Sequence, residues 1–256
     1  MRALSILYAA LIYGFIFLPV AVLILFSFQA TQFPIPPFTG PSLRWYGAVL
    51  SDSRLTAGLI NSVAVALASS AVSVLLGFLA AWGFARFRLP GEALLRALIA
   101  IPLTVSYLII GMGLLVMFNA IGLPKSLWAA GIGHVVINLP LCFAIVYSQM
   151  GDHQMNIERA ARDLGAAEWQ VLLLVTAPML WPALFAAFFL SMTFSWDEFV
   201  ISWLLTRFDT TLPVEIWNLL RSGLNPKTNA VGALVFGVSI LLAILFELVA
   251  LRRRPA

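Results

Sequence analysis

Two neighbouring carboxylates, Asp197 and Glu198, stand within the otherwise apolar stretch 191–203. A charged group in apolar surroundings must be solvated or paired, because its desolvation is costly. The spacing predicts a continuous helical face that Glu198 shares with three hydroxyls: Ser191, Ser195 and Ser202. A polar face that ends in two carboxylates could line a pathway for a cation. The candidate pathway residues are Ser195, Trp196, Asp197, Glu198 and Ser202.

A second interpretation of the acidic pair stays open. Asp197 and Glu198 could pair with Arg or His side chains of neighbouring helices and only hold those helices together. The apolar runs contain no Lys or Arg as an obvious partner, although one of them contains His134. We expect His134 to be a neutral residue that lies at the membrane interface or makes hydrogen bonds between helices.

The second informative stretch, 156–178, crowds charges of both signs together. Asn156 is a residue type that caps helix starts, and Gly165 is the type that ends helices in a left-handed conformation. The pattern predicts a helix over 157–164, about 12 Å long. Its exposed face would carry the i,i+4 pairs Glu158–Arg162 and Arg159–Asp163. Because Ala160 and Ala161 leave one side nearly flat, the helix suits a groove on another protein.

Other kinds of site have little support in the sequence. No G-x-x-x-x-G-K-[ST] phosphate loop occurs, so the chain is not expected to hydrolyse ATP. No H-E-x-x-H or G-x-S-x-G motif supports an intramembrane enzyme. The surroundings of His134 and His153 lack the ligand pattern of a metal site. The one cysteine, Cys142, is expected to pack within the fourth predicted span. We therefore predict no catalytic residues, no metal and no cofactor bound by this chain.

The composition explains what must position these two stretches. Of the 256 residues, 62% are hydrophobic and 10% are charged, and the mean hydropathy is +0.99. Soluble chains carry about 25% charged residues, so this chain belongs in a membrane. Six runs lack a charged residue and are compared with the ~20 residues that span a bilayer: 3–43, 55–85, 97–124, 126–151, 169–196 and 229–246. We predict an all-α membrane protein with six transmembrane helices.

The distribution of basic residues predicts the orientation. Six spans put both termini on one side, and Arg252–Arg254 directly after the last span favour the cytoplasm for that side. This choice places nine basic residues inside and six outside. It also places the loop 152–178 in the cytoplasm. Outside would lie the proline-rich segment 33–41 and an amphipathic helix over 211–223, which could meet a soluble receptor or lie on lipid.

The segment Arg159–Gly165, followed by Pro178, resembles the "EAA…G…P" cytoplasmic loop of ABC importer permeases. Arg159 stands where the family has Glu, and Ala177 stands where a larger apolar residue precedes the Pro. The stretch 194–202, Phe-Ser-Trp-Asp-Glu-Phe-Val-Ile-Ser, is similar to the acidic segment of spermidine and putrescine permeases. An Arg-Trp-Tyr sequence before the second span adds a weaker similarity.

The resemblance implies a type I ABC importer permease (MetI-like) fold, with 1–256 as one permease domain and 152–178 as its coupling loop. The implied coupling residues are Glu158, Arg159, Ala160, Ala161, Arg162, Asp163, Leu164 and Gly165. The implied partners are a second, non-identical permease, two ATP-binding subunits that bind ATP and Mg, and a periplasmic binding protein. The implied location is the bacterial inner membrane.

Together these features predict a permease subunit that carries a small cationic solute, with polyamines as the first choice of substrate. Opine-like or amino-acid-derived solutes remain open as alternatives. A secondary transporter with Asp197 or Glu198 as proton carrier is a further alternative, although the internal repeats common in that class are not found.

Overall fold

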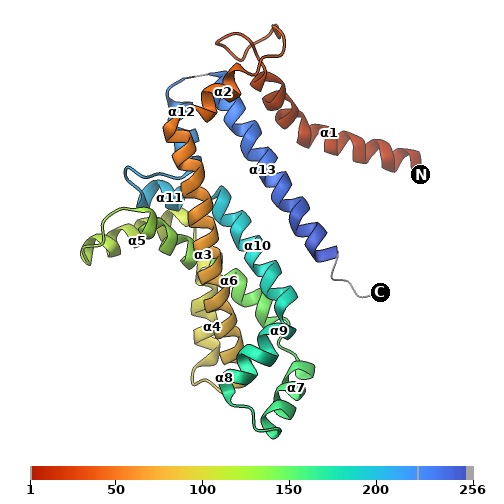
Figure 1. Ribbon diagram of the computed structural model, residues 1–256, viewed down its shortest axis with the longest axis vertical. Helices are drawn as coiled ribbons and strands as arrows, with labels where there is room; N and C mark the ends of the chain where they lie inside the picture. The colour runs from red at the N-terminus through yellow and green to blue at the C-terminus, as the bar shows by residue number, and fades with distance from the viewer. Residues whose placement is uncertain (1, 224, 252–256) are drawn as a thin grey trace. The chain divides into compact units, whose positions relative to one another are not determined.

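The structure, a computed structural model, describes residues 2–223 and 225–251. Over these residues the chain folds into helices joined by turns and loops, as the sequence predicts (Figure 1). The helices, in chain order, are α1 (Arg2–Ser27), α2 (Arg44–Leu50), α3 (Ser53–Arg86), α4 (Glu92–Ala100), η1 (Ile101–Leu103), α5 (Tyr107–Ala120), α6 (Leu127–Tyr147), α7 (Asp152–Asp163), α8 (Glu168–Gln170), η2 (Val171–Thr176), α9 (Ala177–Met179), α10 (Trp181–Asp197), α11 (Val200–Leu205), α12 (Leu212–Arg221) and α13 (Pro226–Leu251).

Each predicted span matches a helix or a bent pair of helices. Within the described residues, three helices are long and apolar enough to cross a membrane, namely Leu4–Ser27 in α1, α3 and α6. Two bent pairs pass the same test when each is taken as one span: Glu92–Leu103 with Tyr107–Ala120, bent by 106°, and Glu168–Met179 with Trp181–Asp197, bent by 73°. The apolar part of α13, Pro226–Leu241, is shorter. The membrane character is thus plain, while the count of six spans stays a prediction.

The contacts divide the chain into two compact units. One contains the described residues of Met1–Leu59 and of Leu212–Leu245, and the other contains Ile60–Thr211 and the described residues from Phe246 onward. Both stretches that the sequence singles out, 156–178 and 191–203, lie in the second unit.

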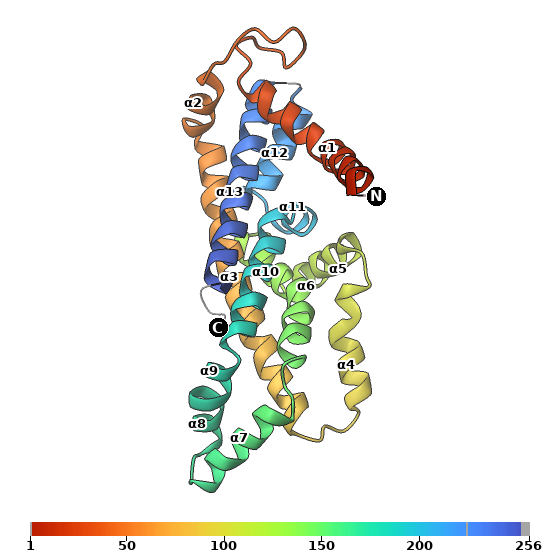
Figure 2. The same ribbon diagram turned by 90° about the vertical axis from the view of Figure 1, so that its right-hand side faces the viewer.

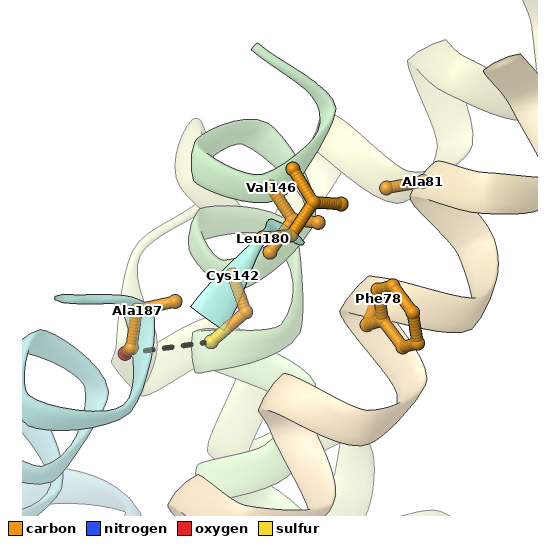
Figure 3. Packing of buried hydrophobic residues seen from close by; sticks show 6 residues of the cluster. All are labelled: Phe78, Ala81, Cys142, Val146, Leu180 and Ala187. Atoms are coloured by element: carbon orange, nitrogen blue, oxygen red, sulfur yellow. Dashed lines mark hydrogen bonds between the residues drawn. The ribbon is translucent and has the colours of Figure 1, made fainter. Parts of the chain in front are cut away.

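In the second unit, α6 packs along α10, and α3 meets α6 closely at a glycine (Figure 2). A Cβ added to Gly77 of α3 would lie 2.8 Å from the backbone nitrogen of Phe143 in α6, so only glycine fits there. Small residues are what allows helices to pack closely in a membrane. The core below this contact is formed by Phe78, Ala81, Cys142, Val146, Leu180 and Ala187 (Figure 3). Cys142 is fully buried and donates to the carbonyl of Ala187, which confirms the predicted packing role.

A second core holds α11 against α5 and α6. It contains Phe118, Ala129, Ala130, Ile137, Ile201 and Leu205. A Cβ on Gly133 would come within 2.4 Å of Cγ2 of Ile201, so α6 and α11 touch through this glycine. The contact fixes α11 directly after the acidic pair.

In the first unit, the segment between α1 and α2 is ordered around one buried side chain, Gln29. Its amide nitrogen donates to Thr31 Oγ1 and to the carbonyls of Ile35 and Pro37, and its amide oxygen accepts from the backbone N–H of Thr39. As predicted, the proline-rich segment 33–41 forms no helix. The predicted amphipathic helix is present as α12, and α13 begins at Pro226. Asp52 before α3 pairs with Lys227 of α13.

Candidate functional site

The acidic pair lies at a break between two helices. α10 ends at Asp197, Glu198 has the extended angles φ −75° and ψ 118°, and α11 begins at Val200. The prediction of one continuous helical face through Glu198 is therefore wrong. The reason is that the Glu198 carboxylate accepts from the backbone N–H of Ile201 at 2.9 Å and of Ser202 at 3.1 Å. A side-chain acceptor that satisfies the free N–H groups at a helix start favours a new helix there.

Glu198 is buried against a histidine of the neighbouring helix α6. Its Oε2 lies 3.5 Å from Nε2 of His134, and the two side chains are 2% and 1% exposed. The His134 ring also contacts Ser195 Oγ through Nδ1 at 2.6 Å and Ser202 Oγ through Nε2 at 3.0 Å. The prediction that His134 makes hydrogen bonds between helices is confirmed.

The cluster extends to α3 through one hydroxyl. Ser195 Oγ lies 3.0 Å from Ser69 Oγ, and both residues are buried. One polar cluster thus joins α3, α6, α10 and the start of α11. Ser69 is not among the predicted pathway residues. Its signal in the sequence is a group of small residues in the predicted span 55–85, namely Ser69, Ser70 and Ser73.

Not every candidate pathway residue belongs to this cluster. Asp197 is exposed, whereas its neighbour Glu198 is 5% exposed. Trp196 is 3% exposed, and within the described part of the chain its Nε1 has no hydrogen-bond partner. Ser195, Glu198 and Ser202 meet around His134. The two acids therefore have different surroundings: Glu198 has the histidine partner that the structural interpretation proposed, and Asp197 presents its carboxylate at the surface of this chain.

The second candidate stretch forms α7, which is longer than predicted. It begins at Asp152 rather than after Asn156, and Gly151 precedes it. Asn156 lies inside the helix, so its predicted capping role is wrong. Asp152 in the first turn favours the earlier start, because a negative charge there interacts well with the helix dipole. The predicted end is confirmed, since Gly165 has φ +88°.

Glu158 is not on the exposed face of α7, as the pair pattern had suggested. It is fully buried, and Arg86 at the end of α3 holds it with Nε–Oε2 at 2.6 Å and Nη2–Oε1 at 3.1 Å. Thr176 Oγ1 donates to Glu158 Oε1 at 2.9 Å. A two-pronged contact from Arg is among the strongest hydrogen-bonded pairs in proteins. This side chain therefore fixes α7 to α3 and to η2.

The remaining charges of α7 pair differently from the prediction. Arg162 Nη2 lies 3.8 Å from Glu158 Oε2, so that predicted pair is present but long. Arg162 makes its shorter contact to Glu168, Nε–Oε1 at 2.8 Å. The hydrogen bond from Arg162 holds the pKa of Glu168 below its ordinary value. The predicted Arg159–Asp163 ion pair is absent from the ion pairs of the described residues.

The outer face of α7 is exposed and carries apolar side chains beside charges. Leu164 is 90% exposed, and Ile157, Arg159, Ala160 and Asp163 are exposed as well. An exposed apolar patch with a charged rim is typical of a surface that binds another protein. The structure therefore keeps Glu158 inside, where it positions the helix, and turns the rest of the segment outward.

A short π-helix, η2, connects this segment to α10. It runs from Val171 to Thr176, and the chain then bends by 73° between Met179 and Trp181, a stretch flanked by Pro178 and Pro182. π-helical turns are rare and occur frequently at functional sites. Among the described residues, no three His, Cys, Asp or Glu side chains are grouped as metal ligands would be.

The chain is similar to transport proteins over most of its length. It is 28% identical over 240 residues to the spermidine/putrescine transport system permease protein PotC of Escherichia coli strain K12, covering 93% of this chain and 90% of PotC. It is 32% identical over 237 residues to the putrescine transport system permease protein PotI of the same strain, covering 89% of this chain and 84% of PotI.

Solved structures share the fold. A crystal structure of a bacterial ABC transporter involved in the import of the acidic polysaccharide alginate matches with TM-score 0.71 at 18% identity, over 99% of this chain and 97% of that chain. The MetNI methionine ABC transporter in an inward-facing conformation matches with TM-score 0.57 at 18% identity, over 80% of this chain and 100% of that chain.

A family assignment follows from these matches and from the two segments described above. Residues 73–255 match the family described as "Binding-protein-dependent transport system inner membrane component", and this range includes both stretches 156–178 and 191–203. The chain therefore belongs to the family of inner membrane components of binding-protein-dependent transport systems, whose members are transport components rather than enzymes.

Proposed function

We propose that this chain is a permease subunit of an ATP-driven importer for polyamines such as spermidine and putrescine. The observation that carries the substrate class is the similarity to PotC and PotI over 93% and 89% of the chain. Polyamines are small cations, and an exposed carboxylate beside the polar cluster is the group that such a substrate requires.

The two acids would have separate roles in this function. Asp197 is the exposed acid and would face the translocation pathway, where it could pair with a substrate ammonium group. Glu198 would act through position, since its carboxylate already holds the start of α11 and contacts His134. Ser195 and Ser202 would support the same arrangement through their contacts with the His134 ring. Trp196 is buried and would pack behind Asp197.

The coupling role belongs to α7 and the loop 152–178. Its exposed face, which includes Arg159, Ala160 and Leu164, would dock in a cleft of an ATP-binding subunit. This placement requires the loop on the cytoplasmic side, with six spans and both termini in the cytoplasm. The basic residue Arg159 would meet an acidic or neutral group of that cleft, since it stands where the family has Glu.

The assembly would contain three further kinds of subunit. A six-span chain needs a second permease to enclose a pathway, and a different chain is favoured over a copy. Two ATP-binding subunits would supply the energy, with ATP and Mg bound by them. A periplasmic binding protein would deliver the solute to the outer face.

Reconstitution tests this proposal directly. The chain is co-expressed with its partner permease, its ATP-binding subunits and its binding protein, and the complex is placed in proteoliposomes. Uptake of labelled spermidine and putrescine should require ATP and the binding protein, and it should persist when an uncoupler removes ion gradients. A competing excess of an opine or of a basic amino acid should leave polyamine uptake unchanged. Uptake that ignores ATP and stops with the uncoupler would instead identify an ion-coupled transporter.

A further inference from the structure

The buried carboxylate of Glu158 connects three segments that are far apart in the chain. It belongs to α7, accepts two hydrogen bonds from Arg86 at the end of α3, and accepts a third from Thr176 at the end of η2. The side chains of Arg86 and Glu158 are 6% and 0% exposed. The many hydrogen bonds of this buried ion pair specify its geometry. Removal of one partner is costly, because the other charge is then left buried and unpaired.

Two routes lead from α7 to the acidic segment. The first follows the peptide chain through α8, η2 and α9 into α10, and it contains a π-helical turn and a 73° bend. The second crosses the Glu158–Arg86 pair into α3, from which α7 is separated in sequence by α4, α5 and α6. The first route contains the kinds of irregularity at which helices bend. The second enters a single uninterrupted helix.

The second route leads directly to the polar cluster. From Ser69 to Arg86, α3 is continuous, and the 17 steps between these residues span about 26 Å. Ser69 Oγ contacts Ser195 Oγ, which in turn contacts His134 beside Glu198. Between these ends, α3 is supported by its close contact with α6 at Gly77. In both views, α3 extends from the neighbourhood of α7 along α6 and α10 (Figures 1 and 2).

From these contacts we infer that Arg86 and Glu158 are positioning residues. Through them α3 becomes a second route by which movement of α7 reaches the acidic segment. Movement of α7 is passed through the ion pair to α3, and from Ser69 to the segment that carries Asp197. The hydrogen bond from the Thr176 hydroxyl to the same carboxylate makes η2 move together with α7. The inference deepens the proposed function, because it assumes that α7 is moved by an ATP-binding subunit.

The first test measures the ATP hydrolysed per solute imported by the reconstituted complex. Arg86→Gln and Glu158→Gln should raise this ratio at least about twofold, in the range by which residues along a coupling network change coupling. The double variant Arg86→Glu with Glu158→Arg should bring the ratio back toward the wild-type value. The matched control is Arg88→Gln, since Arg88 is exposed and lies two residues beyond Arg86. A merely structural role would lower assembly and both rates together and leave the ratio unchanged, which would overturn the inference.

A milder variant is used if the complexes that contain Arg86→Gln or Glu158→Gln do not assemble. Arg86→Lys keeps a positive charge beside Glu158 but loses the two-pronged contact. This variant should still raise the amount of ATP hydrolysed per solute imported. A wild-type value would contradict the transmission of movement through α3.

A second test does not depend on transport. Spin labels at the exposed positions Leu67 and Asn156, in a Cys142→Ala background, report the distance between α3 and α7 in lipid nanodiscs. In the full complex, the distance distribution should be narrow with and without nucleotide when this chain is otherwise unchanged, and it should be broad in Arg86→Gln. Equal widths would overturn the inference even if the complex imports polyamines. The wild-type complex could show no ATP-dependent uptake while the width of the distance distribution still depends on Arg86. That result would contradict only the proposed function.

Discussion

His134 of α6 and Glu198 at the α10–α11 break form a buried contact, with 3.5 Å between Nε2 and Oε2. The contact explains how a carboxylate is tolerated inside an apolar chain. Glu198 also accepts backbone N–H groups of α11, so its carboxylate has partners in both a histidine ring and a helix start. The apolar packing of Ile201 against Gly133 keeps these groups together.

Replacement of His134 by Leu should destabilise the protein. The variant removes the ring contacts to Ser195 and Ser202 and leaves their buried hydroxyls with fewer partners. Loss of a buried hydrogen-bonding partner costs about 1–3 kcal/mol, so the thermal midpoint of the purified chain in detergent should fall. Ile132→Leu, an exposed position on the same helix, is the control and should keep the wild-type midpoint. An unchanged midpoint in the His134 variant would contradict the role given to the cluster.

Neutral variants of the two acids should have different effects. Asp197→Asn should lower polyamine uptake about tenfold or more, since a charged hydrogen bond contributes about 1.5–3 kcal/mol, and it should leave the unfolding midpoint unchanged. Glu198→Gln should lower the midpoint, because the bonds to Ile201 and Ser202 lose their charge-assisted character. Uptake assays and thermal unfolding on the same preparations give both readouts. Normal uptake by the Asp197 variant would remove it from the pathway.

Much of the architecture follows from composition, because a charge-free run has few alternatives in a membrane. The helix end at Gly165 was equally predictable, since a left-handed residue there favours glycine. Residue spacing predicted the wrong local structure where a side chain competes with the backbone hydrogen bonds of a helix. Glu198 fits a helical face by spacing, yet its carboxylate replaces backbone acceptors and starts a new helix.

The burial of Glu158 could not be predicted from the sequence either, and the reason differs from the one that applies to Glu198. Its spacing to Arg162 fits a surface pair, whereas its principal partner is Arg86 on α3. Pairing between distant segments depends on the packed arrangement of helices, which periodicity does not specify. The separate surroundings of Asp197 and Glu198 have the same origin, because they depend on where His134 of α6 lies.

The Asp52–Lys227 pair should make the stability of the first unit depend on pH. The hydrogen bond from Lys227 holds the pKa of Asp52 below its ordinary value. A lowered pKa in the folded state stabilises the fold above the pKa of the unfolded state, and this contribution is lost as the pH falls through the lowered value. A partly exposed pair contributes about 0.2–1 kcal/mol. Thermal midpoints of wild type and Lys227→Met should therefore differ at neutral pH and converge in acid. Lys125→Met, an exposed lysine elsewhere, should show no such convergence.

Gly165 ends α7 with φ +88°, and a bulky residue there should disturb coupling rather than the membrane core. No atom lies within 4 Å of the position that a Cβ would occupy, so the cost comes from backbone strain alone, about 1–3 kcal/mol for a residue in this region. Because the strain is relieved by rotating the end of α7, Gly165→Val should reduce uptake more than ATP hydrolysis in the reconstituted complex. Gly151→Ala is the matched control at the other end of the same helix, where φ is −90° and alanine is unstrained. If Gly165→Val keeps wild-type uptake and wild-type hydrolysis, α7 is not the element that couples the two activities.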